Sequence, residues 1–252
     1  MSLDERSQAG DDALGGGRMT LQEHLTELRS RLIKAVVGVV LGAVVGFLLY
    51  ERTLDLLQAP YCEVLGADNC TFLITDPVAA FSIRMRLAGY SGLLFASPVV
   101  FWQLWRFITP GLYAREKRFA IPFVVASVVL FTLGAGLALY TMPNALQFLV
   151  SIGGPDFEHF YEPTRYLRLV TTMMLAFGVA FEFPILLVFL QMAGIVQPQR
   201  LAGWRRGAIV GIFAIVALIT PSGDPITLVT LALPMVLFYE GSILVGRFLQ
   251  RR

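Results

Sequence analysis

The feature that most constrains this chain is the separation of its apolar residues from its charged residues. Long apolar stretches fill the sequence from Leu32 to Gly246, and the charged residues lie almost entirely in the gaps between them. The chain is 56% hydrophobic and 15% charged, whereas a soluble globular domain carries about 25% charged residues. Apolar stretches this long are typical of helices that cross a bilayer. They lack the strict alternation of a membrane β-barrel, so the expected fold class is an all-α integral membrane protein.

The apolar stretches predict six transmembrane helices in one membrane domain, residues 20–250. We place them at about residues 32–50, 87–108, 119–142, 167–195, 207–220 and 226–246. The fifth would span only roughly 21 Å, against a hydrocarbon core of about 30 Å, so we expect locally thinned lipid or partner helices there. Residues 1–19 are polar and glycine-rich without the pattern of a signal peptide, and we expect a disordered cytoplasmic tail.

The distribution of lysine and arginine predicts the orientation of the spans. With an even number of spans both termini face one side, and that side holds 15 of the 20 basic residues. By the positive-inside rule both termini are cytoplasmic. The five basic residues on the other side are Arg52, Arg84, Arg86, Arg165 and Arg168.

The two outer loops predicted at residues 51–86 and 143–166 are large and rich in proline, aromatic and acidic residues. We expect short interfacial helices in both. The first loop holds both cysteines of the chain, Cys62 and Cys70. The outer side of a bacterial membrane is oxidising, which permits a disulfide. A disulfide and a pair of free thiols both stay open as alternatives, and either way we expect a structural role.

The segment before the first span has the pattern of an amphipathic helix. Thr20 and Glu23 form a capping box that starts a helix. Leucines at 21, 25, 28 and 32 then form one apolar stripe, which predicts a helix on the cytoplasmic membrane surface that leads into the first span. Glu27 and Arg31 are four residues apart and can form an ion pair. By this pattern alone, the two charges do no more than stabilise the helix.

Three further carboxylates stand out. Glu116 is the sole acid of the basic cytoplasmic loop 103–118, and by itself this loop does no more than set the topology. Glu182 lies near the middle of the fourth span, where a charge costs about 2.5–3.5 kcal/mol, so we expect it to face a cavity, a partner or a proton path. Pro184 frees a backbone carbonyl near Ala180 and predicts a kink beside Glu182. Glu240 lies late in the sixth span and can reach the interface.

Several chemistries lack their residues in this sequence. There is no HExxH motif, no phosphate-binding GxxxxGK[ST] loop and no zinc-like set of cysteines. Both histidines lie outside the predicted spans, and no span carries paired aspartates. We therefore expect no enzyme activity, no metal, no cofactor and no binding of nucleic acid.

In four separated blocks the chain resembles the TatC family, the multispan subunit of the twin-arginine protein translocase. The blocks are residues 24–31, 107–118, 177–184 and 220–224, and the resemblance covers roughly residues 20–250. It implies a receptor for twin-arginine signal peptides that moves folded proteins across the membrane by means of the proton motive force. It also implies an oligomeric complex with the single-span subunits TatA, TatB or both.

The resemblance assigns roles to individual residues. Glu27 and Glu116 match the two glutamates that bind the arginine pair of the signal peptide, which suits the two-pronged fit of guanidinium to carboxylate. Supporting members of that surface are Arg29, Phe107, Leu112 and Tyr113. Glu182, and more weakly Glu240, would contact a partner helix inside the bilayer. Pro60 and Pro98 match prolines that shape the first outer loop and bend the second span.

Two other functions stay open on the residues alone. An ion- or proton-coupled transporter built around Glu182 and Glu240 would show inverted repeats and broken helices at the midplane, and the sequence has no repeat. An intramembrane enzyme would need catalytic residues that the predicted spans lack.

Overall fold

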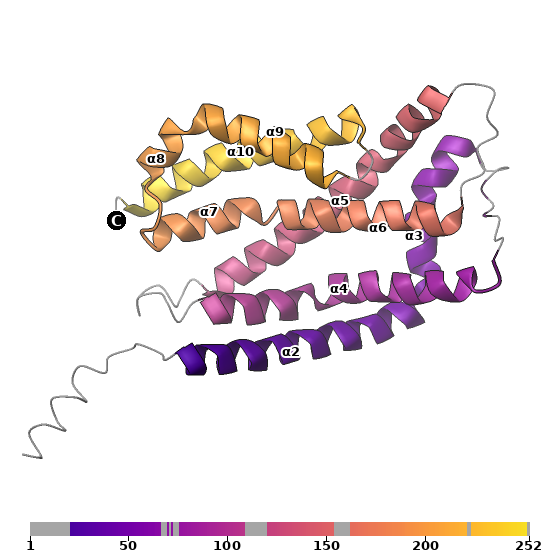
Figure 1. Ribbon diagram of the computed structural model, residues 1–252, viewed down its shortest axis with the longest axis horizontal. Coiled ribbons are helices and arrows are strands. Elements are labelled where there is room, and N and C mark those ends of the chain that lie inside the picture. The colour runs from indigo at the N-terminus through magenta and orange to yellow at the C-terminus, as the bar shows by residue number, and fades with distance from the viewer. Residues whose placement is uncertain are drawn as a thin grey trace, which may run out of the picture.

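The computed structural model describes residues 21–66, 70, 72, 76–108, 120–153, 162–220 and 223–250. All regular secondary structure in these segments is helical, as the sequence predicts (Figure 1). The helices are α2 (Leu21–Leu48), α3 (Tyr50–Leu65), α4 (Ala79–Ile108), α5 (Ala120–Gly153), α6 (Pro163–Ala180), α7 (Phe183–Met192), α8 (Pro198–Gly203), α9 (Arg205–Ile219) and α10 (Pro225–Gln250).

The helices form an elongated bundle with two distinct ends (Figure 1). The start of α2, the last turn of α4, the start of α5 and the last turn of α10 lie at one end, which we call the Leu21 end. Helix α3, the start of α4 and the start of α6 lie at the other, the Cys62 end. The two ends of the described chain therefore lie at the same end of the bundle.

Five helical segments are long and apolar enough to cross a bilayer: Gln22–Leu48, Ala79–Ile108, Ala120–Ile152, Pro163–Met192 and Pro225–Phe248. They correspond to the predicted spans one to four and six, although several of their boundaries differ from the predicted ones. The predicted fifth span corresponds to α9, which has 15 residues and measures about 22 Å. The number of six crossings stays a prediction.

Helix α2 differs from the expectation at its start. The predicted boundary between an interfacial helix and the first span lies near Leu32, whereas α2 runs without interruption for 28 residues from Leu21. The apolar stripe of the first turns continues directly into the apolar residues of the span, and no proline or glycine interrupts the helix before Gly38. Consequently the structure does not set a separate surface helix apart from the span.

Both outer segments contain helical residues, but only the first contains a separate short helix of the kind predicted. The first outer segment contains α3, a helix of 16 residues. In the second, residues 143–153 continue α5 past Pro143 instead of forming a separate helix. Of the two prolines singled out by the resemblance, Pro60 is buried inside α3 and Pro98 lies inside α4.

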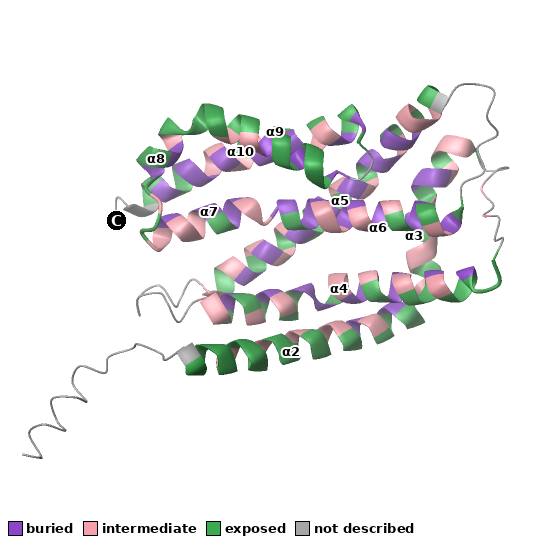
Figure 2. Ribbon diagram, viewed as in Figure 1, coloured by how far each residue is buried: buried purple, intermediate pink, exposed green. Residues whose placement is uncertain are grey.

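Apolar side chains cover much of the surface of the bundle. Helix α2 is the extreme case: Leu32, Leu41 and Leu48 are 59%, 63% and 77% exposed (Figure 2). A soluble monomer rarely exposes a continuous apolar surface of this extent. A lipid bilayer is the solvent in which such a face is stable, which agrees with the membrane class predicted from composition.

The buried core lies where α5, α6 and α10 meet. Its fully buried residues include Ala138 of α5, Phe177 of α6 and Leu231 of α10. Small residues let α5 and α6 approach closely: a Cβ atom added to Gly134 would lie 2.5 Å from the backbone oxygen of Phe177. The core therefore fixes α6, and with it the break at Glu182, against the centre of the bundle.

The packing of α2 on α4 depends on another set of glycines. A Cβ atom added to Gly42 would lie 2.4 Å from the backbone oxygen of Gly92, and one added to Gly46 would lie 2.1 Å from Ser91 Oγ. Gly38, Gly42 and Gly46 recur at every fourth residue, so they share one face of α2. Small residues at this spacing are a common contact between membrane helices. This contact was not among the predictions made from the sequence.

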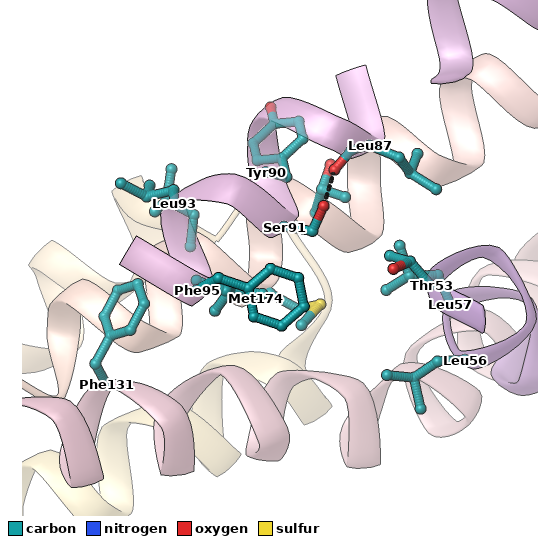
Figure 3. A pocket seen from close by; sticks show the side chains of 13 residues that line it. Thr53, Leu56, Leu57, Leu87, Tyr90, Ser91, Leu93, Phe95, Phe131 and Met174 are labelled. Carbon is teal, nitrogen blue, oxygen red and sulfur yellow. Dashed lines mark hydrogen bonds between the residues drawn. The ribbon is translucent and has the colours of Figure 1, made fainter. Parts of the chain in front are cut away.

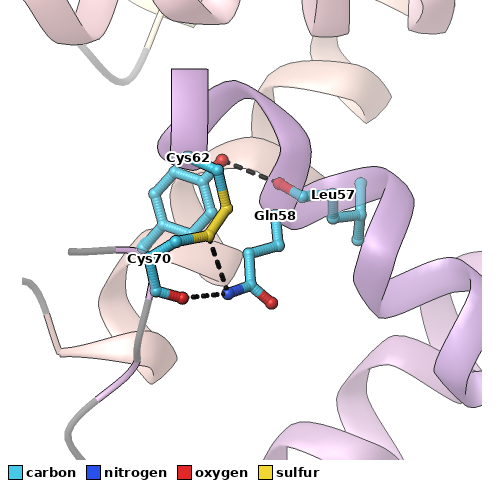
Figure 4. Close-up of a disulfide and its surroundings, with 5 residues drawn as sticks. Leu57, Gln58, Cys62 and Cys70 are labelled. Carbon is cyan, nitrogen blue, oxygen red and sulfur yellow. Dashed lines mark hydrogen bonds between the residues drawn. A yellow bond between two sulfur atoms is a disulfide. The ribbon is translucent and has the colours of Figure 1, made fainter. Parts of the chain in front are cut away.

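The Cys62 end is held by a disulfide between Cys62 of α3 and Cys70, which resolves the alternatives that the sequence left open (Figure 4). The side-chain amide of Gln58 donates to the backbone oxygen of Cys70 at 2.7 Å. At the same end of the bundle, the hydroxyl of Tyr166 in α6 donates to the backbone oxygen of Leu57 in α3 at 2.7 Å. These contacts tie α3 both to the segment that follows it and to the start of α6.

Reduction of this disulfide is expected to lower stability without unfolding the bundle. The closed loop spans eight residues, for which loop-closure entropy corresponds to about 2.5 kcal/mol. We expect the unfolding temperature in detergent to fall by roughly 5–10 °C after reduction. The double variant Cys62→Ser/Cys70→Ser serves as control: its unfolding temperature should match that of the reduced protein and not respond to dithiothreitol. An unchanged unfolding temperature after complete reduction would show that the hydrogen bonds alone hold this region.

Candidate functional site

The first candidate site lies at the Leu21 end, on the first turns of α2. Arg31 pairs with Glu27 as the spacing predicts: Arg31 Nε donates to Glu27 Oε1 at 2.9 Å, and Arg31 Nη2 also bonds this oxygen. The side chains of Arg31 and Glu27 are only 16% and 20% exposed. The other carboxylate oxygen, Glu27 Oε2, is buried and accepts no hydrogen bond from the described residues. This oxygen therefore has unused capacity for a hydrogen-bond donor.

The last turn of α4 completes this region. The ring of His24 stacks on Phe107, with the ring centroids 4.6 Å apart. This contact places Phe107, at the end of α4, one helical turn from Glu27 along α2. Of the predicted signal-peptide surface, the structure thus brings Phe107 and the Glu27 segment together.

The remaining residues of that prediction divide into two groups. Arg29 is exposed on α2, two residues from Glu27. The others lie outside the described residues, in the segment between α4 and α5: Glu116, Leu112 and Tyr113. The described helix ends on either side of this segment, the end of α4 and the start of α5, lie at the same end of the bundle as the start of α2 (Figure 1).

The second candidate site is the break between α6 and α7. Helix α6 ends at Ala180 and α7 begins at Phe183, with Pro184 in its first turn. The interruption lies where Pro184, which has no N–H, cannot continue the ladder of hydrogen bonds, and the kink itself stays a prediction. Glu182 occupies this break. Its oxygen Oε1 is buried and has no hydrogen-bond partner among the described residues.

Two buried side chains from neighbouring helices, Ser127 and Trp105, lie next to one another on the side of Glu182. The side chain of Ser127 in α5 lies close enough to the Glu182 carboxyl group to interact with it by hydrogen bonding. The indole Nε1–H of Trp105 in α4 donates to Ser127 Oγ at 2.9 Å. The side chain of Ser127 is completely buried and Trp105 is 4% exposed. Sequence reasoning missed both, because nothing in the spacing of α4 and α5 indicates which residue faces α6.

Glu240 has a partner within the chain. Its Oε2 lies 2.8 Å from Nη2 of Arg205, at the start of α9. This ion pair joins α9 to α10 and accounts for a carboxylate at this position. Contact with a partner helix is therefore not needed to explain Glu240, and that role stays a prediction.

An apolar cavity of about 160 Å³ lies between α3, α4, α5 and α6 (Figure 3). Leu57, Leu87, Phe131 and Met174 contribute to its wall, one from each helix. The hydroxyl of Ser91 also lines it but donates to the backbone oxygen of Leu87 at 2.6 Å. A cavity lined in this way offers no convergent polar groups for a polar ligand or a reaction.

Within the part of the chain that the structure describes, no cluster of histidine, cysteine, aspartate or glutamate has the geometry to hold a metal ion. The two candidate sites instead present single carboxylates, each with one unpartnered oxygen, near helix packing surfaces. Such groups suit the recognition of hydrogen-bond donors and cations.

The comparisons with known proteins agree with this architecture. The sequence profile of the TatC family, Sec-independent protein translocase protein, matches residues 23–234. The chain is 40% identical to the Sec-independent protein translocase protein TatC of Frankia casuarinae over 245 residues, which cover 93% of this chain and 67% of that protein. It is 38% identical to TatC of Aquifex aeolicus over 237 residues, covering 93% and 97%.

A solved structure shows the same fold. The crystal structure of the twin-arginine translocase receptor TatC in DDM superposes with a TM-score of 0.75 at 36% sequence identity, and the match covers 89% of this chain and 99% of that one. The long matched length, the identity and the shared fold lead to one conclusion. This chain belongs to the TatC family of Sec-independent protein translocase proteins.

Proposed function

We propose that this chain is the receptor for twin-arginine signal peptides and the core membrane subunit of a translocase that moves folded proteins. The observation that carries the proposal is the Glu27 carboxylate, which is largely buried and has one oxygen without a donor. A buried acceptor without a partner costs about 1–3 kcal/mol. A guanidinium group of the signal peptide would supply the missing donors, with two parallel N–H groups and a permanent charge.

Glu116 supplies the second carboxylate in this proposal, and two carboxylates read two adjacent arginines. Phe107 is included in the proposed surface because its ring stacks on His24, one helical turn before Glu27. Arg29, Leu112 and Tyr113 complete the proposed surface. This surface lies on the cytoplasmic side of the bacterial inner membrane if both termini are cytoplasmic, which the distribution of basic residues supports.

Glu182 is proposed to contact the single-span partner subunits TatA or TatB inside the bilayer. A polar side chain within a membrane helix is costly and marks a functional contact. The helix break at residues 181–182 also frees backbone groups at the same depth. The proton motive force is the proposed energy source, and several copies of the chain are expected within the complex.

Binding of a twin-arginine peptide to the purified protein tests the receptor function. Wild-type protein should bind the Arg-Arg peptide at least tenfold more tightly than its Lys-Lys counterpart, because lysine cannot form the two-pronged contact. Fluorescence anisotropy of labelled peptides at fixed salt measures both affinities. Glu116→Gln should reduce the difference between the peptides. Equal affinity for the two peptides in wild type would contradict the receptor proposal and leave the family membership untouched.

A further inference from the structure

The Glu182 carboxyl group is held by a chain of hydrogen bonds that crosses three helical segments. Trp105 comes from α4, Ser127 from α5 and Glu182 from the break between α6 and α7. Both links are shielded from the surroundings, since Trp105 is 4% exposed and Ser127 is completely buried. Buried polar groups in such a place are either satisfied or costly, so their alignment restricts the orientation of every member.

The direction of this chain follows from the chemistry of its members. An indole N–H donates a hydrogen bond and accepts none. The Trp105 bond occupies one of the two lone pairs of Ser127 Oγ, and the hydroxyl hydrogen of Ser127 remains able to donate to the carboxylate of Glu182. A serine on a helix without such a partner commonly turns its hydroxyl to a backbone carbonyl three or four residues earlier. Trp105 opposes that turn by fixing the Ser127 oxygen from the other side.

Packing holds the indole in turn. The Trp105 ring stacks on Phe123 of α5, with centroids 4.6 Å apart, and meets Phe189 of α7 edge-on at 5.4 Å. Phe189 lies on the helix that Glu182 precedes, so the aromatic contacts and the hydrogen bonds connect the same segments. The break at residues 181–182 removes the regular helix that would otherwise fix the Glu182 side chain, and these contacts replace that constraint.

We propose that Ser127 and Trp105 are positioning residues, which hold the Glu182 carboxyl group in the orientation that meets a partner helix. This inference rests on the partner contact proposed above for Glu182. It assigns no direct contact with the partner to either residue, because both are buried. They affect assembly only by orienting the carboxyl group of Glu182.

Infrared difference spectroscopy of the purified protein, without any partner, tests the positioning directly. The carboxyl bands of Glu182 are identified as those lost in Glu182→Gln. Ser127→Ala and Trp105→Phe should shift these bands, because each removes a link of the chain while Phe keeps an aromatic ring at residue 105. Two matched controls come from α4: Ser97→Ala, at a buried serine, and Trp102→Phe, at an indole that is 38% exposed. Bands that stay unmoved in Ser127→Ala would overturn the proposal.

Co-purification with the single-span partner tests the consequence. Ser127→Ala should reduce recovery of the partner by roughly three- to fifteenfold, which corresponds to an interhelical hydrogen bond of about 0.6–1.7 kcal/mol. Ser127→Thr, which keeps the hydroxyl, should restore recovery. On the Glu182→Gln background, Ser127→Ala should have no further effect. An equal additional loss on that background would show that Ser127 acts by packing and would overturn the proposal.

The two experiments separate the inference from the proposed function. If Glu182→Gln leaves partner recovery unchanged, the partner contact of Glu182 is wrong, and the infrared shifts alone decide whether Ser127 and Trp105 position the carboxyl group. Thermal unfolding in detergent, measured for every variant, should stay within a few degrees of wild type. A variant that unfolds earlier is replaced by Ser127→Cys, which keeps the size of the side chain and weakens the hydrogen bond.

Discussion

Glu27→Gln is expected to weaken binding of a twin-arginine signal peptide by about tenfold to a hundredfold. The substitution keeps the size of the side chain and removes its charge. A hydrogen bond to a charged group contributes about 1.5–3 kcal/mol, and Oε2 is the one oxygen of Glu27 that is open to a donor of the peptide. The unpartnered Oε2 of Glu27 makes this loss specific, because that oxygen has capacity for a ligand while Arg31 holds the other. Titration of labelled Arg-Arg peptide into the detergent-purified wild type and variant measures the loss of affinity.

Stability separates this effect from misfolding. The amide oxygen of the glutamine in Glu27→Gln can still accept a hydrogen bond from Arg31, so the unfolding temperature of this variant should stay close to that of wild type. Glu23→Gln, one turn earlier on α2, provides a matched control that loses the same charge and should bind the peptide normally. Comparable losses in the two variants would mean that overall negative charge at this end, and not the Glu27 site, attracts the peptide.

Gly42→Ala is expected to detach α2 from α4 in part and to destabilise the protein by about 1–3 kcal/mol. The added methyl group would lie 2.4 Å from the backbone oxygen of Gly92, and backbone cannot rotate away as a side chain would. Overpacking of a close helix contact has a cost of this size. Because α2 packs chiefly on α4, the shift should reach the His24–Phe107 contact and weaken peptide binding as well.

Gly89→Ala supplies the control for this variant. Gly89 lies on α4, one turn from Gly92, and an added Cβ atom there would meet nothing within 4 Å. Alanine is favoured over glycine inside a helix by about 1 kcal/mol, so this variant should be as stable as wild type or slightly more stable. Thermal unfolding of the two variants, together with a disulfide cross-link engineered between α2 and α4, measures the difference. Equal behaviour of Gly42→Ala and Gly89→Ala would show that α2 tolerates a wider separation.

Some features of the site followed from local sequence and are confirmed. The Glu27–Arg31 pair formed as expected, since residues four apart on a helix are neighbours whatever surrounds them. The break beside Glu182 also followed, because a proline removes a helical hydrogen bond by its own covalent structure. The spacing of Gly38, Gly42 and Gly46 was equally readable, and attention to small residues at every fourth position would have predicted the contact of α2 with another helix.

Other features lay beyond local sequence. The continuity of α2 past Leu32 contradicted the expected boundary, because a cytoplasmic amphipathic stripe and an apolar span have the same helical period where they join. Glu240 is held by Arg205, 35 positions earlier in the chain, and only the packing of α9 on α10 brings them together. The pairing of Cys62 with Cys70 likewise depended on the tertiary structure, which brings the two Cα atoms to 4.9 Å from each other.

The sequence by itself determined that this protein is a helical membrane protein, where most of its helices run and which carboxylates are unusual. Those conclusions depend on composition and on the positions of charge, proline and apolar residues along one helix, which are local properties. Only the tertiary structure decided that His24 meets Phe107 and that Ser127 and Trp105 lead to Glu182. These contacts join different helices, and the face that each helix turns to its neighbour is set by how all the side chains pack together.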